Sequence, residues 1–141
     1  MPIEQGIHQL NPRLPSSWQY VGLHKRHFYL LLKDLYQKGN VIIIGRGANI
    51  ILADTPGVMH VGLMAPLEVR VKTLMEREHM KEDEAGVYVE QLETARVAYF
   101  QKFFKVSPND PTLYHMMLNM DKMAPATAAD VISHASADLA R

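Results

Sequence analysis

The pattern of apolar and polar residues predicts a buried strand at residues 41–44, around which the fold is organised. Four consecutive β-branched residues stand there, between Gly39-Asn40 on one side and Gly45 on the other. A short apolar run without alternation is typical of a strand covered on both faces, as in parallel sheets flanked by helices. Similar runs predict two more buried strands, at residues 58–64 and 113–118.

The first predicted helix covers residues 16–38. Ser16 or Ser17 is a suitable N-cap, and Gly39 is a typical residue just beyond a helix C-terminus. Residues 1–15 contain three prolines and few large apolar side chains, so we expect an extended arm there. The core-facing stripe of this helix is expected to contain Val21, Phe28, Leu31, Leu32 and Leu35.

Further helices are predicted after the strand at 41–44. Residues 48–52 look helical, and a helix starts at Pro66 with an acidic residue in its first turn. A long helix covers about 83–104, and a last one follows Pro125 with Thr127 as its N-cap. The inward positions of these last two helices are expected to be Val87, Leu92, Val97, Phe100, Phe103, Phe104, Val131, Ile132 and Leu139.

The order of these elements predicts an α/β fold of three layers, in which helices flank a small, mainly parallel sheet. The chain of 141 residues is long enough for one domain with a core of its own. We expect that single domain to consist of the arm at 1–15, the helix at 16–38 and the core at 39–141.

Composition narrows the choice of partners. Fifteen basic and fifteen acidic residues cancel, which argues against nucleic acids as partners, because contacts to many phosphates need a basic surface. The sequence has no cysteine, so disulfides and thiolate metal sites are excluded. The sequence shows no signal peptide and no apolar run near the ~20 residues that span a bilayer. We therefore expect a cytoplasmic protein without a membrane partner.

Arg46 is the leading candidate for ligand binding. It lies in Gly45-Arg46-Gly47, directly after the predicted strand at 41–44. Ligands of open α/β sheets bind beyond the carboxyl ends of the strands, so an anion is expected near this arginine and its two glycines. The alternative is that Arg46 pairs with a carboxylate at the sheet edge, and the residue alone does not decide between the two.

An ordered set of short segments points to one known family. The segments are 45–49 (GRGAN), 60–70 (HVGLMAPLEVR), 93–96 (ETAR), the aromatic run at 99–104, Asp110-Pro111 with Tyr114, and 118–121 (LNMD). From Gly39 onward, the sequence resembles the cytidylate kinase-like family of P-loop nucleoside monophosphate kinases.

The resemblance implies phosphoryl transfer from a nucleoside triphosphate to a pyrimidine nucleoside monophosphate. Arg46, in its turn at 45–47, would contact the acceptor nucleotide, and Arg70 would be a further phosphate ligand. Arg96 matches the lid arginine that steadies the transferred phosphoryl group, and Asn119 matches the loop beside the donor base. Magnesium and ATP would be cofactors only if this activity survives.

The departure from the family lies at the start of the chain. Such kinases begin with a strand and a glycine-rich loop whose amides, lysine and hydroxyl hold the donor phosphates and magnesium. Here the first 38 residues contain only Gly6 and Gly22, far apart. We therefore predict a nucleotide- or phosphate-binding protein that is inactive or incomplete as a stand-alone kinase. The missing strand would leave a gap between 41–44 and 58–64 or make these two strands pair directly.

Two other interpretations remain open. In the first, the chain is a non-enzymatic oligomeric or regulatory module, with a homo-oligomer or partner-chain interface formed by residues 1–38 and an uncovered strand. In the second, the chain is a fragment whose phosphate loop was lost by truncation or a misplaced start codon.

The single candidate residues also have simpler explanations. Arg96 is an ordinary partner for Glu93 at helical i,i+3 spacing, and Arg70 is typical of a structural surface arginine. His24 and His27 share a helical face, but two ligands do not make a metal site, and we expect none. His60, inside a predicted strand, is typical of a core histidine that has its hydrogen bonds satisfied.

Overall fold

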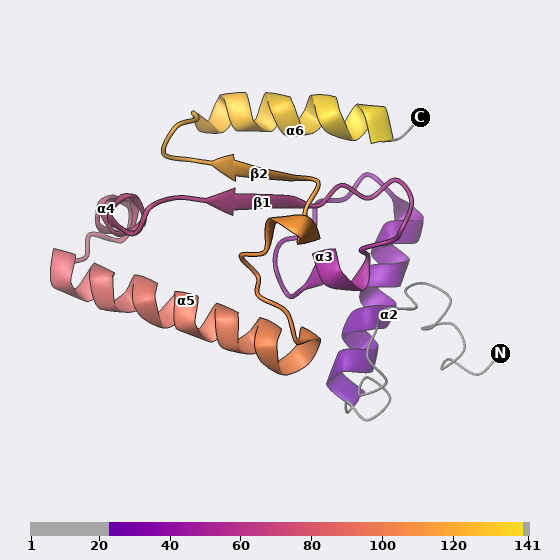
Figure 1. The fold of residues 1–141 in the computed structure, drawn as a ribbon, viewed down its shortest axis with the longest axis horizontal. Helices are drawn as coiled ribbons and strands as arrows, with labels where there is room; N and C mark the ends of the chain where they lie inside the picture. The colour runs from indigo at the N-terminus through magenta and orange to yellow at the C-terminus, as the bar shows by residue number, and fades with distance from the viewer. Residues whose placement is uncertain (1–22, 140–141) are drawn as a thin grey trace. The chain divides into compact units, whose positions relative to one another are not determined.

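A computed structural model describes residues 23–139, with side chains from His27 onward. The chain divides into two compact units, Met1–Val58 and Met59–Arg141. The arm at 1–15, the cap at Ser16 or Ser17, and Val21 lie outside the described residues, and the single-domain assignment stays a prediction. The elements in order are α2 (Leu23–Lys38), α3 (Ala48–Ile51), β1 (Val61–Met64), α4 (Leu67–Glu78), α5 (Glu82–Phe104), the short 3₁₀ helix η2 (Pro111–Leu113), β2 (Met116–Asn119) and α6 (Pro125–Leu139) (Figure 1).

The first unit contains α2, which ends where the sequence predicts. Gly39 has a φ of 66°, and its N–H donates to the carbonyls of Leu35 and Tyr36 at 3.2 and 3.1 Å. A residue without a Cβ adopts this left-handed conformation at little cost, so it closes the helix. Of the predicted core stripe, Leu32 is buried, but Leu31 is exposed and Tyr29 is buried instead. The predicted stripe was therefore wrong at Leu31.

The predicted strand at 41–44 is wrong. These residues form no strand, and the side chains of Ile42 and Ile44 are 89% and 88% exposed. β-Branched residues favour a strand only where a neighbouring strand supplies hydrogen bonds and packing. Within residues 23–139 the sheet has two strands, β1 and β2, so the run at 41–44 has no strand partner. The sequence also allowed direct pairing of 41–44 with the strand predicted at 58–64. That pairing is not observed, because β1 pairs with β2 in the described sheet.

The second unit is built on β1 and β2, which pair in parallel with Val61 opposite Met116 and Met64 opposite Asn119. One backbone hydrogen bond beyond each end extends the pairing, from the His115 N–H to the His60 carbonyl and from the Met120 N–H to the Met64 carbonyl, both 2.8 Å. Both strands lie within the predicted regions or one residue beyond them. The prediction of full burial was wrong for β1, because Leu63 is 62% exposed.

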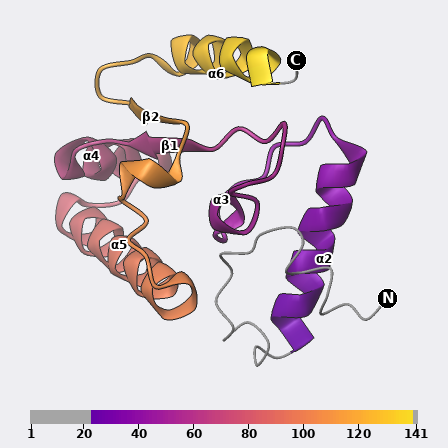
Figure 2. The same ribbon diagram turned by 45° about the vertical axis from the view of Figure 1, so that its right-hand side comes forward.

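Helices cover both sides of this sheet. Figures 1 and 2 show α6 along one side of β1 and β2, and α5 along the other, with α4 packed against α5. The unit therefore has the three layers of the predicted α/β fold. The long helix and the last helix are confirmed, but α6 begins at Pro125, so Thr127 lies inside it and is not the N-cap.

The core of the second unit differs in part from the predicted one. Phe100, Phe104 and Leu118 are buried, as expected from the apolar pattern. Val87 and Leu92 are exposed. Ala85 and Val89 are instead the residues of this part of α5 that are buried in the core of the unit. A helix packed along one stripe buries only positions three and four apart, so a shift of that stripe exchanges neighbouring residues. No helix among residues 23–139 is long and apolar enough to cross a membrane.

Candidate functional site

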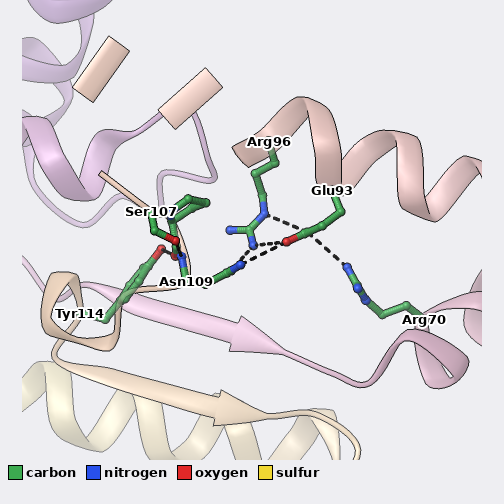
Figure 3. Close-up of polar contacts among 7 residues, drawn as sticks. Arg70, Glu93, Arg96, Ser107, Asn109 and Tyr114 are labelled. Carbon is green, nitrogen blue, oxygen red and sulfur yellow. Dashed lines mark hydrogen bonds and ion pairs between the residues drawn. The ribbon is translucent and has the colours of Figure 1, made fainter. Parts of the chain in front are cut away.

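Two arginines from different helices of the second unit meet at one carboxylate. Arg70 on α4 places Nη1 3.3 Å from Oε2 of Glu93, which lies on the packed neighbour α5. Arg96, one helical turn after Glu93, places Nη2 2.9 Å from Oε1 and Nε 3.2 Å from Oε2. Figure 3 shows the two guanidinium groups approaching Glu93 from either side. The structure thus brings together two of the predicted site residues, Arg70 and Arg96.

Asn109 completes this cluster from the loop after α5. Its Nδ2 donates to Oε1 of Glu93 at 3.3 Å, and its Oδ1 accepts a hydrogen bond from Nη2 of Arg96. Glu93 therefore accepts four hydrogen bonds, two at each oxygen, from donors on three segments of the chain. An ionised carboxylate has about four acceptor positions, so this one is saturated.

The loop that carries Asn109 is held by short-range contacts. The Asn109 N–H donates to Oγ of Ser107 at 3.3 Å, and the Tyr114 hydroxyl donates to the carbonyl of buried Pro108 at 2.6 Å (Figure 3). Asp110 then caps η2 by accepting from the N–H and the hydroxyl of Thr112 at 2.9 and 2.7 Å. These hydrogen bonds hold the pKa of Asp110 below its usual range. The backbone is thus held both before Asn109, at Ser107 and Pro108, and after it, at Asp110, which fixes the position of the Asn109 amide.

The electrostatics of the cluster favour anions. The hydrogen bond from Arg96 lowers the pKa of Glu93, and Asn109 and the charges of both arginines add to this, against the opposite effect of partial burial. Glu93 is therefore ionised at neutral pH, and three charges of the cluster sum to one positive charge. Nε of Arg70 is buried and has no hydrogen-bond partner. The cluster thus has positive charge and a spare donor.

The third predicted arginine, Arg46, belongs to the first unit. It is exposed in a turn where Gly45, Arg46 and Gly47 all have positive φ, at 75°, 59° and 72°. Gly47 is the residue before α3, and its carbonyl accepts from the N–H groups of Ile50 and Ile51 at 3.0 and 3.1 Å. A non-glycine residue in the left-handed region is uncommon and costs energy, which marks this turn as a specialised one.

Asn119 ends β2 and closes a turn. Its Oδ1 accepts from the N–H of Asp121 at 3.0 Å, and its carbonyl accepts from the N–H of Lys122 at 3.1 Å. Asparagine commonly bonds the backbone two residues on in this way, which gives Asn119 a structural task. Its role beside a donor base stays a prediction.

His60 has the environment of a core histidine. It is buried, and its ring stacks on that of His115 with centroids 5.2 Å apart. The backbone N–H of His60 donates to Nδ1 of the His115 ring at 2.9 Å. Among the described residues no group of three or more histidines or carboxylates could hold a metal ion.

Sequence reasoning missed Asn109 as a site residue. The sequence did hold one indication of its role. Asn109 lies in the loop 107–111, directly after the helix that carries Arg96. The pairing of Glu93 with Arg96 follows from i,i+3 spacing, but the approach of Arg70 depends on how α4 packs against α5. That packing is not readable from local sequence.

Comparisons with known proteins agree on one family. Residues 23–122 match the cytidylate kinase-like family. The cytidylate kinase of Sulfolobus acidocaldarius is 30% identical over 70 residues, which are 50% of this chain and 38% of that protein. The cytidylate kinase of Methanopyrus kandleri is 26% identical over 98 residues, covering 64% of this chain and 51% of that protein. The chain thus spans about half the length of these relatives or less.

A solved structure shares the fold. It is the crystal structure of an uncharacterized protein from Eubacterium ventriosum, with a TM-score of 0.77 and 20% sequence identity. The similarity covers 91% of this chain and 74% of that one. At this level of identity the similarity concerns the fold alone.

Proposed function

Because this chain belongs to the cytidylate kinase-like family, we propose that it binds a phosphate-bearing ligand, a pyrimidine nucleoside monophosphate such as CMP, through Arg70 and Arg96. The observation that carries the proposal is the convergence of these two guanidinium groups, from two helices, on one acceptor. Arginine presents paired donors that match the oxygens of a phosphate as well as those of a carboxylate. The relatives named cytidylate kinase supply the nucleotide class.

The proposal concerns binding and leaves phosphoryl transfer aside. These 141 residues contain no glycine-rich loop followed by lysine and serine or threonine, the arrangement that holds donor phosphates. Arg46 is included as a separate proposed phosphate contact, with Gly45 and Gly47 fixing its turn. Asn119 is retained as a proposed contact to a donor base, to be tested with ATP.

The test is a thermal-shift and calorimetric titration with CMP, UMP, CDP and ATP, with and without magnesium. A ligand that binds the native state raises the melting temperature. We expect a shift with the pyrimidine monophosphates. Arg70→Ala and Arg96→Ala should each weaken binding roughly three- to tenfold, since a charge-assisted contact at a half-exposed site contributes about 1 kcal/mol.

Arg77→Ala is the matched control. Arg77 lies on α4, as Arg70 does, is exposed, and is not a partner of Glu93. Its loss removes the same charge from the same helix and should leave binding unchanged. Absence of binding at millimolar CMP, UMP and phosphate would refute the proposal, and so would equal losses in all three arginine variants.

A second candidate function is a role in assembly. It is favoured by the exposure of Ile42 and Ile44, two large apolar side chains in a segment without a strand partner in the described part of the chain. Exposed apolar surface of this kind marks interaction sites. In this proposal the segment 41–44 contacts a second copy of the chain.

A further inference from the structure

We propose that Glu93 is an internal competitor for the ligand, a carboxylate of the chain that occupies the phosphate position between Arg70 and Arg96 until phosphate displaces it. This inference rests on the proposed function and concerns the regulation of the same site. Its starting point is that both oxygens of Glu93 are saturated by donors from α4, α5 and the loop after α5. Figure 3 shows these donors pointing at the carboxylate.

The geometry of the donors suits a phosphate. Arg96 holds both oxygens of Glu93 with Nε and Nη2, at 3.2 and 2.9 Å, a fork that a phosphate can accept through two of its oxygens. A carboxylate has no third oxygen, whereas a phosphate monoester has three. Nε of Arg70 is buried without a partner, so it reaches a phosphate only if the guanidinium turns when Glu93 releases Nη1. The Arg70 side chain is 38% exposed, which leaves room for this turn. A phosphate in the place of Glu93 would then give this donor an acceptor.

The charges require displacement rather than joint binding. With Glu93 in place, the two arginines and the carboxylate leave one net positive charge. A phosphate dianion beside the carboxylate would put three negative charges on two positive ones, and like charges at short range repel. The Glu93 side chain is 29% exposed, so it can turn towards solvent when it releases the arginines.

Competition by Glu93 has a measurable consequence. Each ligand that binds must first break the ion pairs of the carboxylate, and this cost lowers the affinity of the wild-type protein. A neutral residue of the same size removes the cost and leaves both arginines in place. Glu93→Gln should therefore bind inorganic phosphate and CMP roughly three- to tenfold more tightly, the range for losing two partly exposed ion pairs.

The experiment compares phosphate and CMP affinities of the wild-type protein, Glu93→Gln and Glu90→Gln by calorimetry. Glu90 is exposed on the same helix and is not a partner of either arginine, so its change controls for the altered net charge. Tighter binding by Glu93→Gln, with Glu90→Gln like the wild type, is the expected result. Circular dichroism verifies that both variants remain folded.

A second measurement needs no variant. In ¹H–¹⁵N spectra of the wild-type protein, saturating phosphate should shift the Nε–H signals of both Arg70 and Arg96, because Arg96 exchanges its acceptor and Arg70 gains one. If the wild-type protein binds but Glu93→Gln binds no more tightly, the inference is overturned. An Arg96 signal that does not move when the wild type binds phosphate would overturn it as well. Either result leaves the proposed function standing. No binding by either protein would overturn both.

Discussion

Glu93 joins three segments of the second unit, because its carboxylate is shared by Arg70 of α4, Arg96 of α5 and Asn109 of the following loop. A carboxylate with two charged partners and an amide donor is sensitive to its own protonation. The hydrogen bond from Arg96 keeps its pKa below the ordinary value of 4.5, with Asn109 and both arginine charges contributing in the same direction. The folded protein therefore holds a proton on this group less readily than the unfolded chain does.

The stability contributed by Glu93 should depend on pH. A lowered pKa in the folded state stabilises the fold above the unfolded pKa, and this stability is lost as pH falls through the folded pKa. We expect the difference in free energy of unfolding between the wild type and Glu93→Gln to be larger at about pH 7 than at about pH 3. Urea denaturation at both pH values measures it. A difference independent of pH would show that the carboxylate charge does not matter for the fold.

At the scale of elements, the pairing of β1 with β2 depends on Gly62. Gly62 stands opposite Met117 in the sheet, and a Cβ built on it would overlap the sulfur of Met117. The thioether is flexible, so it can move, but only by disturbing its own packing. The absence of a side chain at Gly62 is thus what lets Met117 lie across the sheet.

Gly62→Ala should lower the free energy of unfolding by ~1–2 kcal/mol, because extra volume in a packed position is destabilising. In a Met117→Ala background the same change should cost less, since the overlapping atom is gone. Gly86→Ala in α5 is the control, because its Cβ would meet nothing within 4 Å. That change should stabilise the protein by ~0.5–1 kcal/mol through helix propensity. Urea titrations of the four variants test both effects, and equal costs of Gly62→Ala in the two backgrounds would contradict the explanation.

The sequence predicted the long helices and the regions of both strands, but it also predicted a strand at 41–44 that the structure does not contain. α5 and the end of α2 follow from local rules: apolar spacing, acidic residues in the first turn and Gly39 as a terminator. A strand is completed by hydrogen bonds to a distant segment, so the apolar run at 41–44 indicates only what could pair. The parallel partner of β1 is β2, and α4, α5 and η2 separate the two strands along the chain.

The same limit applies to the site. Spacing along one helix predicted that Glu93 and Arg96 would pair, and the resemblance supplied Arg70 and Arg96 as candidates. Their meeting at one carboxylate needs the packing of α4 on α5, and the contribution of Asn109 needs the course of a loop. Neither follows from residue identity or spacing, because both are set by tertiary contacts.

At the scale of the whole molecule, the proposed assembly role depends on the segment 41–44, which exposes Ile42 and Ile44. Burying Ile42 and Ile44 against a second copy would remove a large apolar area from water, at about 25 cal/mol per Å². We expect the wild-type protein to form dimers or larger species at micromolar concentration in sedimentation velocity. The double change Ile42→Thr and Ile44→Thr keeps the β-branched shape, removes apolar area and should shift the population to monomer.

Val131→Thr provides the control for this experiment. Val131 of α6 was predicted to face the core but is 37% exposed, so that prediction was wrong. Its change tests whether loss of any surface methyl group has the same effect. A wild-type protein that is strictly monomeric across the micromolar range would remove the basis for an assembly role. It would leave the nucleotide-binding proposal unaffected, because Arg70 and Arg96 lie on other elements.

The parallel pairing of β1 with β2 has a consequence for how the second unit folds. His60 and His115, which flank the two strands and stack on each other, are 55 positions apart in the chain. Closing a loop of this length costs entropy before any strand contact is gained, and pairings of high sequence separation form slowly. By contrast, α4 and α5 are neighbours in sequence and can pack early. We expect the sheet to be the last part of this unit to form.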